Sequence, residues 1–378
     1  MTDVPTPQPW SEIGPRYGKI CRMTEQRGSA PPHSATDETL AALAVRLRAS
    51  DTGGWTRDAT RALVVRLGWG WSDSPSVATG RSTGDARLRP VGKYEERHVS
   101  GEAYVELAVP VRHAAPDAAS QAEAFRLAKD ELTGALGQPS VMGVYGRLAP
   151  FLRTVGSWGS PYLRWRGESD TLELRAGQTG PELVLQPTDP AESWFVRQGN
   201  GEEHGITGFF GFRADASNGG LTFPGGWRAH SWETVTRALA AFLTTLPAET
   251  TALRIPMWMP IYGRIEGKGA PILFDIDCGD RLMIAAFADE VVDPASLGWG
   301  TAAEHPTTGR PWPDARHPRL RIDAGGPGEP SGQALAETIV ATARAMGVET
   351  PEDLLIGTEA GDLGEYRVTY YGLGLSMA

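Results

Sequence analysis

The chain has 378 residues, of which 36 are basic and 46 acidic, and its formal net charge is -10. This length favours about two domains, and the acidic balance disfavours binding to nucleic acid or to an anionic membrane surface and favours a basic partner. Cys21 and Cys278 lie far apart in unlike contexts, so we expect no disulfide framework, no metal centre and no cofactor, as is typical of a cytoplasmic protein. No apolar run approaches the ~18 residues of a membrane span.

Residues 1–35 are rich in proline and poor in apolar side chains. Such a segment buries too little apolar surface to offset the entropy of ordering, which predicts a disordered tail. Either Met1 or Met23 can be the start of the chain. An N-terminal α+β domain is expected over residues 36–200.

The spacing of apolar residues predicts the helices and strands of this N-terminal domain. Apolar residues three and four apart predict helices, and alternating residues predict strands. Pro116 and Asp117 predict the start of one helix and Gly137 its end. The expected helices are 36–49, 56–67 and 118–136. The expected strands are 104–111, which should be half-buried, and 162–166, 171–175, 183–186 and 194–197.

Arg164 and Arg166 alternate with Leu163 and Trp165 along one of these strands. Interleaved aromatic and basic side chains can stack on nucleic-acid bases. Strand alternation, however, places the two arginines on one face and the two apolar side chains on the other. Given the acidic net charge, we interpret this segment as an amphipathic strand with a solvated arginine face.

Residues 201–226 form a connector rich in glycine and phenylalanine, whose aromatic side chains predict docking on a neighbour or an edge strand. The C-terminal domain, residues 227–378, begins with a helix that Ser231 caps and Pro247 ends. Its further elements are strands 252–258, 271–276, 281–287 and 366–373, and a helix over 333–346. The predicted fold class is α+β, with two domains that each contain an antiparallel sheet with helices packed on one face. The sequence leaves open whether the two domains arose by duplication.

An apolar strand ends in Asp275-Ile276-Asp277, which is similar to the nucleophile motif of haloacid-dehalogenase-type phosphatases. That similarity implies a carboxylate nucleophile, a second carboxylate that handles the leaving-group proton, and magnesium. Gly279 stands where that family has threonine or valine, and residues 281–287 continue as a strand. We therefore favour a hairpin with its turn at 277–280.

Soft and aromatic side chains concentrate at the end of one predicted strand and in two later loops. Core packing explains most such residues, yet methionine, tryptophan and tyrosine are also enriched at protein interfaces. The partner-binding candidates are Met257, Trp258, Tyr262, Trp299 and Trp312.

A series of motifs in the last third of the chain resembles the carboxyl end of the type III secretion chaperone-like/YbjN (TY-Chap) superfamily. The motifs are Leu297-Gly298-Trp299, Trp312-Pro313, the helix Ala334 to Met346, and Gly347-Val348 followed by Pro351 and Leu354. The N-terminal domain, with its Leu67-Gly68-Trp69, is similar to an actinobacterial family of unknown function. The TY-Chap resemblance implies an α+β fold without catalytic residues that binds proteins, in secretion or in toxin neutralisation.

From these observations we predict a non-catalytic cytoplasmic protein-binding module, an immunity protein that neutralises a polymorphic toxin. Its acidic charge complements a basic toxin or secreted effector. A chaperone for a secreted effector is one alternative, and a magnesium-dependent phosphatase that uses Asp275 and Asp277 is another. Neither the identity of the partner nor the oligomeric state follows from the sequence.

Overall fold

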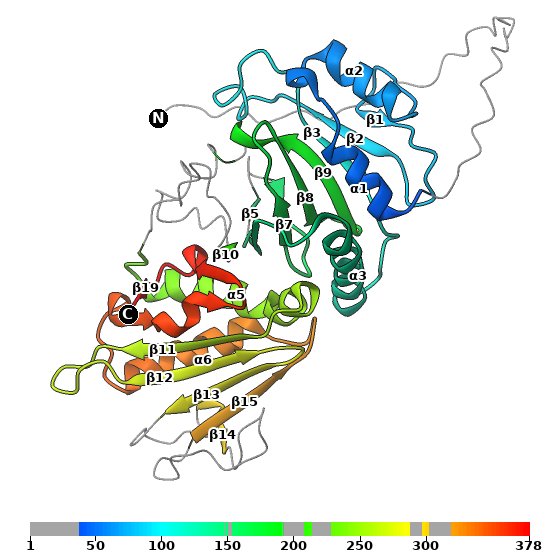
Figure 1. Cartoon of the computed structure of the whole chain (residues 1–378). Helices are drawn as coiled ribbons and strands as arrows, with labels where there is room; N and C mark the ends of the chain where they lie inside the picture. Colours follow the sequence, from blue (N-terminus) through cyan, green and yellow to red (C-terminus); the bar gives the residue numbers. More distant parts are fainter. Residues whose placement is uncertain are drawn as a thin grey trace, which may run out of the picture. The chain divides into compact units, whose positions relative to one another are not determined.

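The computed structural model describes residues 38–146, 148–149, 153–190, 192, 208–213, 228–287, 297–301 and 319–378. In this part of the chain, helices pack on two large β-sheets, which confirms the predicted α+β fold class (Figure 1). The predicted tail, the strand at 194–197 and most of the connector lie outside the described residues, and the predicted domain boundaries stay a prediction.

The larger sheet has ten strands, and all of its neighbouring strands are antiparallel. Its first eight strands in sheet order come from residues 76–213, whereas the last two come from the C-terminal part of the chain. In sheet order the strands are β1 (Ser76–Val77), β2 (Ala86–Pro90), β3 (Tyr104–Pro110), β9 (Pro181–Pro187), β8 (Asp170–Ala176), β7 (Pro161–Trp165), β4 (Val141–Val144), β10 (Phe209–Arg213), β18 (Tyr366–Thr369) and β17 (Asp362–Leu363).

Strand β10 corrects one expectation about the connector. Its aromatic residues were expected to dock or to form an edge strand, but β10 lies between β4 and β18, inside the sheet. Phe209 and Phe210 are buried, with 1% and 0% of their surface exposed. A two-stranded sheet of β5 (Leu148–Ala149) and β6 (Arg153–Thr154) lies apart from the ten strands.

Three helices accompany this sheet: α1 (Leu40–Arg48), α2 (Arg57–Arg66) and α3 (Ala118–Leu136). Each begins at an N-cap residue whose side-chain oxygen accepts a hydrogen bond from the backbone N–H three residues further on. The caps are Thr39, Thr56 and Asp117. Helices α1 and α3 pack against the apolar side of β8 and β9, where they share one buried core.

The smaller sheet has seven strands, all antiparallel except for the pair β16–β19. In sheet order they are β14 (Gly300–Thr301), β15 (Arg319–Gly325), β13 (Leu282–Phe287), β12 (Ile272–Cys278), β11 (Met257–Gly263), β16 (Leu354–Ile356) and β19 (Ser376–Met377). The helices α5 (Trp232–Leu253) and α6 (Gly332–Ala345) pack on its inner face. Figure 1 shows α6 behind β11 and β12.

Helix α5 corrects a second expectation, because it continues through Pro247 instead of ending there. Proline inside a helix removes one hydrogen bond and costs about 3 kcal/mol. The turn after Pro247 is nevertheless buried, and its Ala252 and Leu253 join the core. These two residues were expected to begin a strand, but β11 starts only at Met257.

Short 3-10 helices connect several of these elements, and none of the described helices has the length and hydropathy needed to cross a membrane. The short helices are η1 (Gly53–Trp55), η4 (Pro351–Asp353), η5 (Thr358–Gly361) and η6 (Tyr371–Leu373).

Candidate partner-binding face

The outer face of the seven-stranded sheet carries two of the predicted partner-binding residues. Along β11, Met257, Met259 and Ile261 are buried in the core that the sheet forms with α5 and α6. Side chains alternate along a strand, so Trp258 and Tyr262 share the opposite face. The Trp258 side chain is large, apolar and 46% exposed, and Tyr262 is half-buried.

Acidic and apolar side chains alternate across the strands beside Trp258. Asp277 of β12 lies opposite Trp258, Met283 of β13 lies opposite Asp277, and Asp323 of β15 lies opposite Met283. Facing residues on neighbouring strands have their side chains on the same face. The row therefore places the Asp277 carboxylate next to an exposed indole, while Asp323 lies two strands further on and pairs with Arg281 at 2.8 Å.

Tyr262 is held at the margin of this face by a residue from η5. Its hydroxyl donates a hydrogen bond to Oε1 of Glu359, at 3.1 Å. Burial and the Glu359 carboxylate both raise the pKa of the Tyr262 hydroxyl, so it stays protonated and remains a donor. Glu359 thereby adds a further carboxylate next to β11.

Met257 and Trp299 lie in the core and not on this face. Met257 is 1% exposed and Trp299 6% exposed. The indole Nε1 of Trp299 donates to Oγ1 of Thr342 on α6, at 2.9 Å, and its ring stacks on Phe274 of β12 with the centroids 6.2 Å apart. These contacts revise the set of accessible candidates to Trp258 and Tyr262, while Trp312 lies outside the described residues.

Asp275 and Asp277 both lie within β12, which pairs with β11 on one side and β13 on the other, antiparallel in each case. The structure confirms the predicted hairpin, with the turn at Gly279–Arg281, and includes Asp277 in the strand. Among the described residues, no group of three His, Cys, Asp or Glu side chains could hold a metal ion. The geometry of the two aspartates is therefore that of sheet residues facing a surface.

The ten-stranded sheet carries a buried charged layer that the sequence interpretation missed. Arg164 was expected on a solvated face, but it is 1% exposed, and its Nε donates to Oε2 of Glu173 at 2.6 Å. The Tyr145 hydroxyl and the Gln186 amide also donate to the Glu173 carboxylate. Arg166, also expected to be solvated, pairs with Glu192. Both arginines can be shielded from solvent because each forms an ion pair with a glutamate.

A second part of this layer surrounds Glu106 of β3, which is 6% exposed although its strand was expected to be half-buried. Its carboxylate accepts hydrogen bonds from Arg153 and, through both oxygens, from Arg175. Burial raises the pKa of Glu106, but the two arginines outweigh it and lower the pKa to about 2. These side chains, with Glu182, line a cavity of about 400 Å³. Each arginine that lines it forms an ion pair with a glutamate, which is typical of a structural ion-pair network.

The signal for this charged layer was present in the cross-strand pattern. Arg164 faces Glu173 across β7 and β8, and Arg175 faces Glu182 across β8 and β9. Opposite charges at facing positions stabilise a sheet and can be buried together. Such pairs become visible only when the register of the strands is known.

Comparison with known proteins identifies no relative: no family model, curated protein or solved structure matches the chain. The resemblance to the TY-Chap superfamily therefore stays a prediction.

Proposed function

We propose that the chain is a protein-binding module that docks a basic partner protein on the outer face of the seven-stranded sheet. The observation that carries this proposal is the exposed Trp258 in a row with the carboxylates of Asp277 and Asp323. Tryptophan is among the residues that contribute most binding energy at protein interfaces, because it buries a large apolar surface with little loss of conformational entropy.

Charge supports a basic partner and not an acidic one. Asp277 lies opposite Trp258, Glu359 accepts a hydrogen bond from Tyr262, and the whole chain has a net charge of -10. A lysine or arginine of a partner gains from these carboxylates and from the face of the Trp258 indole. Complementary charge also speeds association and makes it sensitive to salt.

The biological role we propose for this binding is neutralisation of a basic toxin, which the TY-Chap resemblance favours. Service as a chaperone for a secreted effector is the second candidate, and it uses the same face. The two roles differ in what the partner does when it is alone, so an experiment with the isolated partner distinguishes them.

The test begins with cross-linked affinity purification from the native host, followed by calorimetry with the purified partner. We expect Trp258→Ala to weaken binding tenfold or more, which is about 1.4 kcal/mol. Asp277→Lys should weaken it further and reduce its salt dependence. Tyr94→Ala is the matched control, because Tyr94 is 57% exposed but belongs to the loop between β2 and β3. Affinity that is equal in the wild type and in Trp258→Ala contradicts the proposal.

Growth experiments then separate the two roles. If the partner is a toxin, its expression alone arrests growth, the wild-type chain restores growth, and Trp258→Ala restores it poorly. If the partner is an effector, it is harmless but insoluble or degraded without the chain.

A further inference from the structure

A cavity of about 260 Å³ lies between α5 and the C-terminal end of β4 in the ten-stranded sheet, away from the proposed partner-binding face. Both of its walls belong to the compact unit that spans residues 37–378. The volume is just below the roughly 300–1,000 Å³ of typical small-molecule pockets. The residues that matter for its chemistry are Val144, Gly159, Gly208, Phe242, Thr245 and Glu249.

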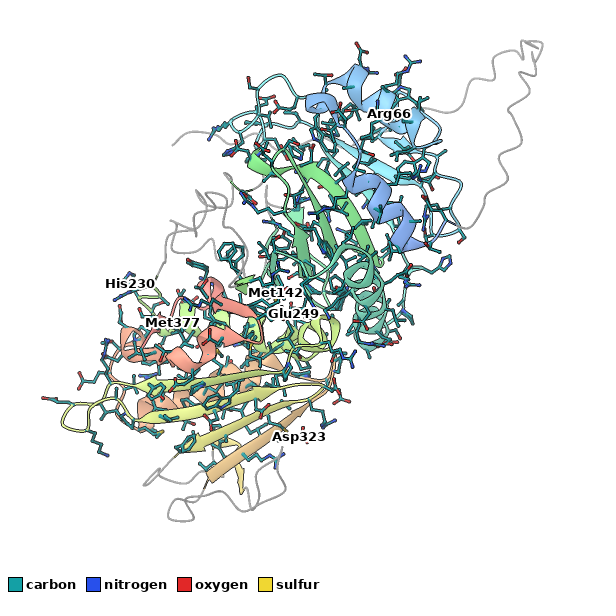
Figure 2. All side chains as sticks on the ribbon, in the orientation of Figure 1. Arg66, Met142, His230, Glu249, Asp323 and Met377 are labelled. Atoms are coloured by element: carbon teal, nitrogen blue, oxygen red, sulfur yellow. The ribbon has the colours of Figure 1, made fainter. Side chains whose placement is uncertain are left out.

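Glu249 is the acidic residue of this cavity, and it lies on the last turns of α5 (Figure 2). It is 2% exposed, and its Oε1 accepts a hydrogen bond from the backbone N–H of Ser160 at 3.0 Å. The Thr245 side chain, one turn earlier on the helix, provides a second hydrogen bond. Among the described residues, no lysine, arginine or histidine forms an ion pair with Glu249, in contrast to Glu106 and Glu173.

The lack of a cationic partner among the described residues has a measurable consequence for this carboxyl group. Burial raises the pKa of Glu249 to about 7, although the hydrogen bonds from Ser160 and Thr245 lower it in part. A buried carboxylate without a counter-ion is unfavourable, because it has lost its hydration without gaining an opposite charge. A cation that entered the cavity would supply that charge.

Glycines keep the space beside the carboxyl group open. A Cβ atom on Gly159, whose φ is +149°, would lie 2.8 Å from Cγ of Glu249. A Cβ atom on Gly208 would lie 2.6 Å from Cγ2 of Val144. Both distances are shorter than real side chains allow, so larger residues at these positions would displace the carboxyl group or narrow the cavity.

The rest of the lining is apolar or hydroxyl-bearing, with one exception. Phe242 and Leu373 provide apolar surface, and Thr244 adds a hydroxyl group. Arg237 also lines the cavity, but it precedes Glu249 by 12 residues on α5, which separates them by about 18 Å along the helix axis. The cavity therefore combines an acidic end and an apolar body.

We propose that this cavity binds a small organic cation, a primary ammonium group attached to an apolar body, with Glu249 as its counter-ion. The ammonium group donates hydrogen bonds to the Glu249 carboxylate and the apolar body packs against Phe242. This site does not depend on the proposed partner-binding face, and either proposal can fail without the other.

Calorimetry with benzylamine, phenethylamine and n-hexylamine tests the site, with the corresponding alcohols as neutral counterparts. At pH 8 we expect at least one amine to bind with a Kd of about 1 mM or tighter. Each alcohol should bind at least tenfold more weakly than its amine. At pH 6, where the free Glu249 carboxyl is mainly protonated, binding should release up to one proton, seen as a dependence of the heat on the buffer.

Two variants locate the binding. Glu249→Gln keeps an oxygen that accepts from Ser160 but carries no charge, and it should weaken amine binding at least tenfold and abolish the proton release. Ala241→Phe fills the cavity from α5 without touching the carboxyl group, and it should also abolish binding. Folding of both is checked by circular dichroism. Failure of all three amines to bind, equal binding of amine and alcohol, or unchanged binding by Glu249→Gln overturns the proposal.

Discussion

Arg164 and Glu173 form an ion pair that is fully enclosed in the protein, with Nε and Oε2 separated by 2.6 Å and side chains that are 1% and 0% exposed. The pair joins β7 to β8 at facing positions. The guanidinium group also lies 5.0 Å from the centre of the Tyr162 ring, which adds a cation–π contact. Two charges buried in this way are tolerated only because they satisfy each other.

Removal of one partner should therefore be costly. Arg164→Leu leaves the Glu173 carboxylate buried without its cation, and we expect the free energy of unfolding to fall by about 3–5 kcal/mol. Urea unfolding measures this loss. The double variant with Glu173→Leu should recover part of it, because no charge then remains to be desolvated.

The matched control for this pair is exposed. Arg57 pairs with Asp73 at 2.7 Å, with side chains that are 59% and 86% exposed. Exposed ion pairs contribute about 0–1 kcal/mol, so Arg57→Leu should change stability little. An effect of Arg164→Leu as small as that of Arg57→Leu would show that the buried pair contributes no more than an exposed one.

Truncation of the two tryptophans of the smaller sheet should lower the free energy of unfolding by very different amounts. Trp299→Ala removes a ring that packs on Phe274 and bonds Thr342, and we expect it to cost about 3–5 kcal/mol of stability. Trp258→Ala removes a ring that is 46% exposed, and its cost should stay below about 1 kcal/mol. Urea unfolding of both variants measures these losses of stability. Loss of the cooperative unfolding transition in Trp258→Ala would identify Trp258 as a core residue.

Local signals in the sequence predicted several helices and strands well, whereas β2, β4 and β15 were not predicted. The bounds of α3 agree with the expected 118–136, because Asp117 caps its start and Gly137, with φ +79°, ends it. The hairpins of β7, β8 and β9 and the helix α6 also agree with expectation to within one or two residues. In each case the decisive interactions lie within a few residues of one another.

Long-range contacts explain where the observed structure differs from the prediction. Pro247 is a helix terminator by local rules, yet the packing of Ala252 and Leu253 extends α5 beyond it. Strand β18 joins the ten-stranded sheet beside β10, from more than 150 residues away in sequence, and no local pattern encodes that pairing. Arg164 is buried because Glu173 faces it, which requires the register.

The incorrect prediction that this helix ends at Pro247 also kept the cavity from being predicted. Because the helix was expected to end at Pro247, Glu249 was not placed on a helix. On the observed α5, Glu249 follows Thr245 by four residues and Phe242 by seven, which is the spacing of one helical face. An acidic residue on an otherwise apolar face is the signal that could have found it.

The phosphatase alternative makes a prediction of its own. With magnesium and p-nitrophenyl phosphate, we expect the wild-type chain and Asp275→Asn to show the same background rate, because both aspartates lie in the middle of an antiparallel sheet. Steady-state assays at equal protein concentration compare them. A magnesium-dependent rate in the wild type that Asp275→Asn abolishes would instead establish an enzyme.

Glu249 should make the stability of the protein fall as the pH rises. Its pKa is raised from the ordinary 4.5 to about 7 in the folded state, so the folded chain binds more protons than the unfolded chain between these values. The cost is absent below about pH 4.5, grows up to pH 7 and is fully present above it. A shift of this size corresponds to roughly 3 kcal/mol. Glu249→Gln should therefore stabilise the protein at pH 8 by up to that amount and have little effect at pH 4.

Urea unfolding of the wild type and of Glu249→Gln across this pH range measures the difference. Glu106→Gln provides a control of opposite sign. Burial raises the pKa of Glu106, but Arg175 and Arg153 lower it to about 2, so its contribution is stabilising above pH 4.5 and disappears as the pH falls toward 2. Glu106→Gln should therefore destabilise the protein at pH 8. A difference between wild type and Glu249→Gln that stays constant from pH 4 to pH 8 would mean that Glu249 does not titrate in this range, and that its carboxyl group has a counter-ion.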